Sequence, residues 1–257
     1  MPANNNIDEK EHTYQTIKAK PVTLKDDFLF FNNKWYFTFF SALLKLIIKV
    51  FLIYLIGPLV FGFKVRNKKK LKENKKSGHI FISNHIHPLD SFLIGTYLFP
   101  KRAYFTMLES NLGLPFIGKL MRFLGGVPIP TKRAQLANFE TEMGIALKKK
   151  HFVGFFPESA LKPYHPSIRN FKKGAIHFAL KMEVAIIPMV MILKKPKGIY
   201  KLYKRKPLIE LHILDRYLIT TKGTKRETVN YHLEALQKIV STYFNEHSDI
   251  KEDNTNG

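Results

Sequence analysis

The sequence contains no cysteine among its 257 residues. This absence excludes disulfide bonds, thiolate zinc sites and a cysteine nucleophile, and it is compatible with a reducing compartment. Acidic residues are also scarce, since 20 Asp and Glu stand against 42 Lys and Arg, giving a formal net charge of +22. Such an excess attracts acidic lipids, phosphorylated substrates or nucleic acids. Because no nucleic-acid-binding motif occurs, we expect lipid or substrate, and not nucleic acid, as the partner.

A cleavable signal peptide is not expected, because residues 1–27 are polar and mixed in charge. The main apolar block follows at residues 35–63, "WYFTFFSALLKLIIKVFLIYLIGPLVFGF", which exceeds the roughly 20 residues that cross a bilayer. Lys45 and Lys49 interrupt it on one helical face. A charge at mid-bilayer costs about 3 kcal/mol, whereas an interfacial helix leaves both lysines among the headgroups. We expect membrane association, either spanning or interfacial; the alternative is a buried pair of core helices.

The basic run "KVRNKKKLKENKK" follows this block directly, as expected on the cytoplasmic side of a membrane anchor. We therefore expect a flexible tail (1–27), a membrane-anchoring helical segment (28–64), a folded domain (65–245) and a disordered acidic tail (246–257). Within the domain, short β-like runs alternate with helical patterns, which predicts an α/β fold.

The expected strands cover residues 79–83, 103–108, 152–159 (where the strand runs into a turn), 184–193 and 208–214. Residues 127–130 carry prolines and are expected to form an edge strand or a loop. The expected helices cover residues 91–99, 114–126, 133–150, 172–182 and 225–247. Asp90 or Ser91 is a candidate cap for the first of these helices.

The stretch "SNHIHPLDS", residues 83–91, follows the first expected strand of the domain, where catalytic groups of α/β folds gather. A turn of this length brings Asp90 near the imidazole of His85. The carboxylate then fixes the tautomer, and the imidazole takes a proton from an attacking hydroxyl. In one alternative the pair merely hydrogen-bonds a turn. In another, His85, His87 and Asp90 bind a metal ion such as zinc; that pattern is incomplete, so we expect no metal and place His87 beside the site.

Further polar candidates come later in the chain. Glu158 in "FFPES" stands at a strand end, where a carboxylate organises a site or binds a polar substrate; a solvated turn residue is the alternative. The stretches "IRNFKKGAIH" and "GGVPIPTKR" supply basic candidates for binding a phosphate: Arg169, Lys172, Lys173, Lys132 and Arg133. The alternative for these basic groups is a solvated helical face.

Taken in order, these pieces resemble the lysophosphatidic acid acyltransferase family, glycerolipid acyltransferases with an Asn-His-x4-Asp motif. That motif stands here as Asn84-His85-Ile86-His87-Pro88-Leu89-Asp90. "LESNLGLPFIGKLMRFLGGVPI" is similar to the stretch that leads to the second block of the family. "FPE" (156–158) and "FKKGA" (171–175) match the third block and its sequel, and "VAIIPMV" (184–190) matches the fourth. The resemblance covers residues 65–215.

The resemblance implies a mixed sheet flanked by helices, of the glycerol-3-phosphate acyltransferase type, preceded by membrane-facing helices. It implies that His85, oriented by Asp90, activates the free hydroxyl of lysophosphatidic acid. That hydroxyl attacks the thioester of acyl-CoA or acyl-carrier protein, and phosphatidic acid forms. The thioester is a co-substrate, and neither a cofactor nor a metal is implied. Asn84 and Glu158 are expected to contact the substrate, at the cytoplasmic face of the membrane.

The sequence departs from the family where arginines bind the phosphate of the acceptor. Thr131 stands at the arginine that ends the second block, and Leu161 stands at the arginine of the third, where Ser159 and Ala160 replace Gly and Thr. Lys132 and Arg133 follow Thr131 directly and are candidates for binding the substrate, and Lys162, Arg169 or Lys173 are the candidates to substitute for these arginines. Three alternatives stay open: the same chemistry on another lysolipid or amino-lipid, a metal-dependent hydrolase, or a non-catalytic protein that binds anionic lipid.

Overall fold

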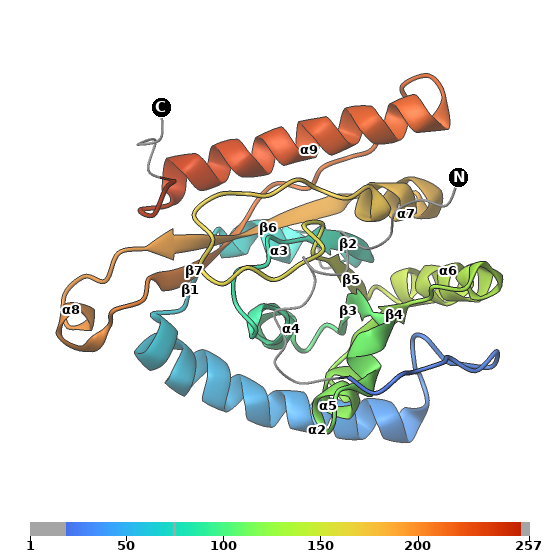
Figure 1. Ribbon diagram of the computed structural model, residues 1–257, viewed down its shortest axis with the longest axis horizontal. Coiled ribbons are helices and arrows are strands. Elements are labelled where there is room, and N and C mark those ends of the chain that lie inside the picture. Colours follow the sequence, from blue (N-terminus) through green and yellow to red (C-terminus); the bar gives the residue numbers. More distant parts are fainter. Residues whose placement is uncertain (1–18, 74–75, 253–257) are drawn as a thin grey trace.

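The computed structural model describes residues 19–73 and 76–252. Within these residues one mixed sheet has the strand order β1-β7-β6-β2-β5-β3-β4 (Figure 1). Its strands are β1 (Lys64–Arg66), β2 (His79–Ile82), β3 (Ala103–Leu108), β4 (Gly126–Ile129), β5 (Phe152–Phe155), β6 (Ile186–Lys194) and β7 (Leu208–Ile213). All neighbours pair in parallel except β6 and β7. The expected α/β fold with a mixed sheet is confirmed, and β4 is an edge strand.

Helices cover both faces of the sheet (Figure 1). On one face α7 (Gly174–Met182) packs on β2, and α9 (Lys225–His247) packs on β6 and on α7. Helix α6 (Arg133–Lys148) packs on β5. On the other face α4 (Asp90–Leu98) packs on β3, and α2 (Trp35–Lys49) with the π-helix η1 (Val50–Phe61) covers α4. The shorter helices are α3 (Lys68–Glu73), the 3-10 helix η3 (Glu109–Gly113), α5 (Ile117–Phe123) and α8 (Tyr200–Tyr203).

The central strands β2 and β5 are buried at every position, as is β6 except at its last residue. Burial on both faces explains their continuous apolar sequences. The close packing of β2 on β5 requires a glycine at position 154, because a Cβ there would lie 2.1 Å from the ring of Phe81. These strands form the middle of the core, and their carboxyl ends carry the candidate site.

The chain that leads into α2 is tied to the domain by charged side chains. Arg122 donates to the carbonyl oxygens of Phe30, at 2.6 Å, and Leu29. Glu142 accepts the backbone N–H groups of Phe30 and Phe31 at 3.2 and 2.8 Å. Leu24 is also buried. Residues 19–27, expected to be flexible, therefore pack on the domain; the rest of that expected tail lies outside the described residues.

The other end of the chain is also packed further than expected. Helix α9 continues to His247, and Asp249 forms an ion pair with Lys194 at 3.1 Å. Ser248 is buried. Residues 246–252, expected to belong to a disordered tail, are therefore held on the domain, and residues 253–257 lie outside the described part of the chain.

The apolar block forms one helix, Trp35–Phe61, made of α2 and η1 and called the apolar helix below. The helix has 27 residues, and its most apolar window of 18 residues has a mean hydropathy of 2.3. By length and composition it could cross a membrane. It runs along one side of the domain (Figure 1), and only 17% of that window is buried. That exposure argues against the alternative of buried core helices.

The two lysines of the apolar helix face the domain. Lys45 is buried, and its ammonium lies 3.4 Å from the place a Cβ on Gly125 would take. Lys49 donates to the carbonyl oxygen of Phe99 at 2.7 Å. The expectation that both lysines reach the headgroups is wrong, because the domain supplies their surroundings. Every exposed residue from Trp35 to Val60 is instead apolar or aromatic, so the helix turns an apolar face outward.

Candidate active site

The candidate site lies at the carboxyl ends of β2 and β5, which are neighbours in the sheet. The loop after β2 carries His85, and the loop after β5 runs beside it. The backbone N–H groups of Lys162 and Tyr164 donate to the carbonyl oxygens of His85 and Ile86 at 3.2 and 2.9 Å. Two segments far apart in the sequence thus form one side of the candidate site. They lie at the edge of the sheet where α/β folds place their sites.

His85 and Asp90 lie within hydrogen-bond distance, since 3.0 Å separates Nδ1 from Oδ2. The same Oδ2 accepts the backbone N–H groups of Ile86 and His87, each at 2.8 Å. The Asp90 side chain is fully buried. Although Asp90 is the first residue of α4, its carboxylate points back to the preceding loop. The expected cap by Asp90 or Ser91 is wrong, because the N-terminus of α4 has no side-chain cap.

The imidazole of His85 is fixed on one side and open on the other. Its ring stacks on Phe156, with centroids 4.2 Å apart and planes inclined by 20°. The side chain stays 22% exposed. Because the Asp90 carboxylate accepts at Nδ1, the proton lies on Nδ1 and Nε2 is the free acceptor. An imidazole held this way can take a proton from a bound hydroxyl.

His87 lies beside this pair and faces the apolar helix. Its Nδ1 accepts the backbone N–H of Leu89 at 3.2 Å. Its ring packs edge-on against Phe61 and Tyr164, with centroids 4.9 and 5.7 Å away. Burial lowers the pKa of His87 below its usual value, so the ring is neutral at neutral pH. His87 therefore connects the site to the end of the apolar helix.

The alternative of a metal centre requires several ligand side chains that lie close together. Across residues 19–73 and 76–252, no group of three or more His, Cys, Asp or Glu side chains is placed to hold a metal ion. His87 turns toward aromatic rings, whereas Asp90 bonds His85.

Glu158 organises the loop after β5. Its carboxylate accepts the backbone N–H groups of His85 and Arg169 at 3.3 and 3.1 Å, and the Arg169 guanidinium at 2.8 Å. Burial raises the pKa of Glu158, and the positive charge of Arg169 opposes that shift. Arg169 also donates to the carbonyl oxygen of Ala160. Arg169, a phosphate candidate by sequence, is thus already engaged inside the site.

We expect Glu158→Ala to lower the free energy of unfolding by about 3–5 kcal/mol, because it leaves the guanidinium of Arg169, whose side chain is only 16% exposed, without its carboxylate. Chemical denaturation followed by circular dichroism measures the change. Glu140→Ala is the matched control, since Glu140 pairs with the half-exposed Lys181, and a loss within about 1 kcal/mol is expected there. Equal losses in the two variants would contradict the role of burial.

The other expected substrate residues lie in different places. Asn84 is fully buried, and its amide bonds the backbone of Met191 at 2.9 and 2.8 Å. Asn84 therefore joins the loop to β6, and its expected substrate contact stays a prediction. Lys132 and Arg133 are exposed at the start of α6. They follow β4, which lies three strand positions or about 14 Å across the sheet from β2. Lys173 is exposed before α7.

The backbone at Ser159, where the sequence departs from the family motif, has a conformation that suits glycine. Ser159 has a φ of 64°, in the left-handed region that favours the glycine of the family block. Thr131 donates its backbone N–H and hydroxyl to Glu109 at 3.1 and 2.8 Å, and Leu161 is half-buried. Neither arginine position of the family therefore carries a charge.

Sequence reasoning missed four side chains that surround His85 and His87: Phe156, Tyr164, Lys204 and Lys206. Their signal is present in the sequence, as aromatic residues after the β5 run and as the basic-aromatic stretch "KGIYKLYKRKP" before β7. Nothing in that stretch indicates that it folds back toward residues 85–87, which lie more than a hundred positions earlier.

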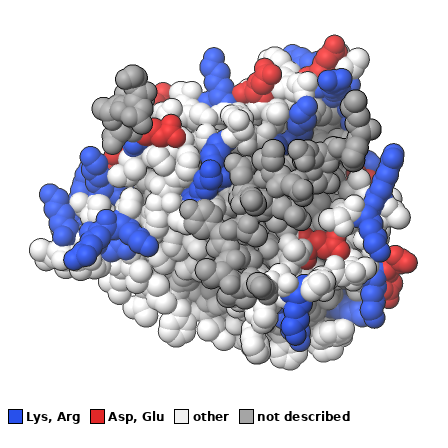
Figure 2. Space-filling view, in the orientation of Figure 1, with Lys and Arg blue, Asp and Glu red and all other residues white. Residues whose placement is uncertain are grey.

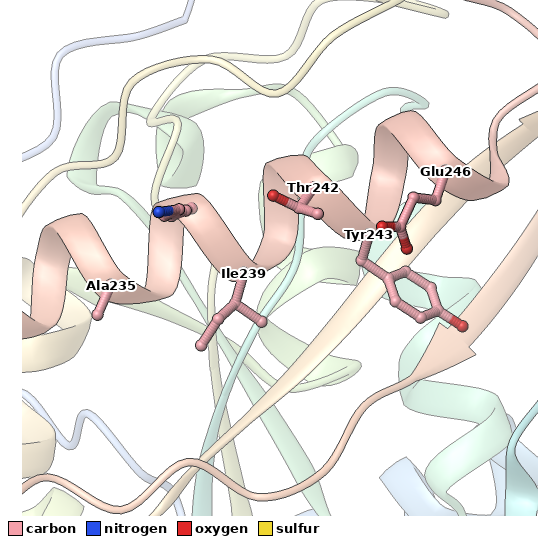
Figure 3. A pocket seen from close by; sticks show the side chains of 6 residues that line it. Ala235, Ile239, Thr242, Tyr243 and Glu246 are labelled. Carbon is pink, nitrogen blue, oxygen red and sulfur yellow. The ribbon is translucent and has the colours of Figure 1, made fainter.

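A hollow lies on the surface of α9, away from this site (Figure 3). Six residues of that helix line it: Ala235, Lys238, Ile239, Thr242, Tyr243 and Glu246. Helix α9 covers the face of the sheet opposite to α4 (Figure 1). The hollow therefore shares no wall with the His85 loop.

Comparisons with known proteins agree with the motif assignment. A family model described as Acyltransferase matches residues 62–192. A 1-acyl-sn-glycerol-3-phosphate acyltransferase of Saccharomyces cerevisiae is 31% identical over 120 residues, which are 45% of this chain and 39% of the relative. One from Limnanthes douglasii is 26% identical over 54% of this chain and 50% of the relative. The matches thus span half or less of the length of these relatives.

Among solved structures, the crystal structure of the 1-acyl-sn-glycerophosphate (LPA) acyltransferase PlsC from Thermotoga maritima is similar, with a TM-score of 0.56 at 20% identity. The similarity covers 82% of this chain and 87% of that one, which shows a shared fold. The matched family segment makes up more than half of the 257 residues and contains both loops of the site. The chain therefore belongs to the Acyltransferase family.

Proposed function

We propose that this protein is a 1-acyl-sn-glycerol-3-phosphate acyltransferase, which moves a fatty acyl group from a thioester to lysophosphatidic acid. The observation that carries the proposal is the pair of His85 and Asp90. A buried carboxylate holds Nδ1 at 3.0 Å, and the imidazole keeps an open edge. The names of the relatives and the family membership support the same reaction.

In the proposed reaction, Nε2 of His85 accepts the proton of the free lysophosphatidate hydroxyl. The oxygen attacks the thioester carbonyl, the new C–O ester bond forms, and the C–S bond breaks. The proton then passes from the imidazolium to the leaving thiolate. Asp90 stabilises the imidazolium between these two transfers, as in other histidine–carboxylate pairs. No protein nucleophile takes part in the scheme.

The proposed setting is the cytoplasmic face of an anionic membrane. The apolar outer face of the apolar helix supports bilayer binding, and its length leaves crossing possible. Phe61, at the end of that helix, contacts His87, so the end of the membrane-seeking helix lies beside the site. The donor we propose is acyl-CoA or acyl-carrier protein, both of which are anionic and suit a chain of charge +22.

A second candidate is the same chemistry on a different lysolipid or on an amino-lipid. It is favoured by the uncharged Thr131 and Leu161, because both occupy positions where the family has an arginine for the phosphate. The active pair is the same in both candidates, and only the acceptor differs.

The test is product formation by the full chain, purified in a neutral detergent and followed by mass spectrometry. The acceptors are lysophosphatidate, lysophosphatidylcholine, lysophosphatidylethanolamine, monoacylglycerol and sphingosine, each with oleoyl-CoA or oleoyl-acyl-carrier protein. We expect phosphatidate as the main product. Acylation of another acceptor only would move the assignment to the second candidate, and no acylated product at all would overturn both.

A further inference from the structure

Two lysines from the connection between β6 and β7 (residues 195–207) lie beside the site. The ammonium of Lys204 lies 6.0 Å from the ring centroid of Phe61, and that of Lys206 lies 5.6 Å from the ring centroid of Tyr164. Both rings pack on His87, at 4.9 and 5.7 Å. The two ammonium groups therefore lie over the two aromatic rings that pack on His87, and His87 is two residues from His85 in the sequence.

The connection is held in place by the apolar helix. The hydroxyl of Tyr200 donates to the carbonyl oxygen of Pro58, and that of Tyr203 to the carbonyl oxygen of Leu59, each at 2.7 Å. These carbonyls lie in the last turn of η1. Two hydrogen bonds therefore fix α8 against the apolar helix. This contact also positions Lys204 and Lys206, which follow α8 in the sequence.

The chain direction after α8 separates the basic residues into two sets. Lys204 has extended backbone angles, φ −98° and ψ 124°. In an extended chain, residues two apart lie on the same side and the residue between them on the other. Lys204 and Lys206 both reach rings that pack on His87, whereas Arg205 between them is exposed. Figure 2 shows basic side chains gathered at the end of the molecule where α8 lies.

The charges of these two lysines are not neutralised within the described part of the chain, where neither forms an ion pair with a carboxylate. The positive charges of both lysines help to lower the pKa of His87, so both act electrostatically on the side chain beside the site. An ammonium over an aromatic face keeps N–H donors free for an oxygen ligand. Arg169, in contrast, is paired with Glu158 at 2.8 Å.

We propose that Lys204 and Lys206 bind the phosphate of the acceptor lipid, in place of the arginines missing at Thr131 and Leu161. The inference rests on the proposed function, and it names the group that recognises the substrate. In lysophosphatidate the phosphate and the reacting hydroxyl are on neighbouring glycerol carbons, so positive charge is required next to His85. The lysines beside His87 supply it from the connection that is bonded to the end of the apolar helix.

The test compares two double variants of the full chain in neutral detergent micelles. Lys204→Gln with Lys206→Gln removes the proposed site. Lys201→Gln with Arg205→Gln removes the same net charge from the same connection and is the matched control. We expect the first pair to raise KM for lysophosphatidate at least tenfold with kcat changed less than threefold. KM for monoacylglycerol, which has no phosphate, is expected to stay within twofold in both pairs.

Equal increases of KM in the two double variants would overturn the site, because they would indicate attraction by the basic surface as a whole. An unchanged KM in the first pair would overturn it as well. A thermal unfolding curve of each variant separates a folding defect from a binding defect.

A binding measurement keeps this inference distinct from the proposed function. Native mass spectrometry of wild type and both variants gives the affinity for lysophosphatidate and for monoacylglycerol without turnover. If wild type forms no phosphatidate but binds lysophosphatidate through Lys204 and Lys206, the proposed function fails and the site stands. If wild type is active and its affinity for lysophosphatidate is independent of the two lysines, the site alone fails.

Discussion

His85→Ala is expected to slow phosphatidate formation by about 10²- to 10⁴-fold, the usual contribution of a positioned general base. The loss should fall on kcat, because in the proposed reaction Nε2 of His85 acts on the reacting hydroxyl and not on the rest of the lipid. The imidazole forms one side-chain hydrogen bond and is 22% exposed, so little stability should be lost. Initial rates by mass spectrometry, with a thermal unfolding curve beside them, measure both effects.

His87→Ala is the matched control for this experiment. His87 bonds a backbone N–H and packs on two rings, but its Nδ1 is occupied by Leu89 and its ring turns away from Asp90. We expect its rate to stay within about tenfold of wild type, well short of a lost general base. Equal losses in His85→Ala and His87→Ala would instead favour a shared metal site, which direct metal analysis of the purified protein would then decide.

Asp90→Asn is expected to slow the reaction by about 10²- to 10⁴-fold, since the same replacement in a serine protease triad lowers kcat about 10⁴-fold. The Oδ2 atom of Asp90 accepts from Ile86, His87 and His85, and an amide oxygen can keep these bonds. What the amide lacks is the negative charge that, in the proposed reaction, stabilises the imidazolium. Steady-state rates should therefore fall while the unfolding curve moves little.

Asp90→Ala separates catalysis from structure in the same position. It removes the acceptor from the backbone N–H groups of Ile86 and His87, both at 2.8 Å, and each unpaired donor costs about 1–3 kcal/mol. We expect this variant to lose activity and stability together. A stable but inactive Asp90→Ala protein would contradict the structural role, and an active Asp90→Asn protein would contradict the catalytic one.

The central pair could be predicted because its chemistry is local in the sequence. Five positions separate His85 from Asp90, and a single turn after an apolar strand brings them together. The outcome for Asn84 could not be predicted, because its partner is the backbone of Met191, 107 positions away. A polar residue next to a catalytic histidine looks the same in the sequence whether it binds substrate or closes a loop.

The strands were predictable in proportion to their burial. The apolar runs of β2, β5 and β6 identify themselves, because both of their faces are covered. Strand β1 has only the residues Lys-Val-Arg and was missed. It exists because it pairs with β7, where Arg66 also forms an ion pair with Glu210 at 3.0 Å. Such a strand depends on tertiary contacts and not on its own composition.

The orientation of the apolar helix required the folded domain for the same reason. The spacing of Lys45 and Lys49 places both on one side of the helix, but it does not say what that side meets. In the structure it meets the Phe99 carbonyl and the backbone near Gly125. The sequence therefore predicted correctly that Lys45 and Lys49 share one side of the helix. It did not predict that this side faces the domain and not the lipid headgroups.

The ties of the apolar helix to the domain set how curved a membrane it could follow. Arg122 and Glu142 hold the chain just before its first turn, and Tyr200 and Tyr203 hold its last one. The apolar helix has 27 residues, of which the last 12 form the π-helix that contains Pro58, and its ties at both ends keep its shape fixed. A helix that cannot adapt its shape would touch a flat bilayer over a longer stretch than a small, highly curved vesicle, so its affinity should rise with vesicle diameter.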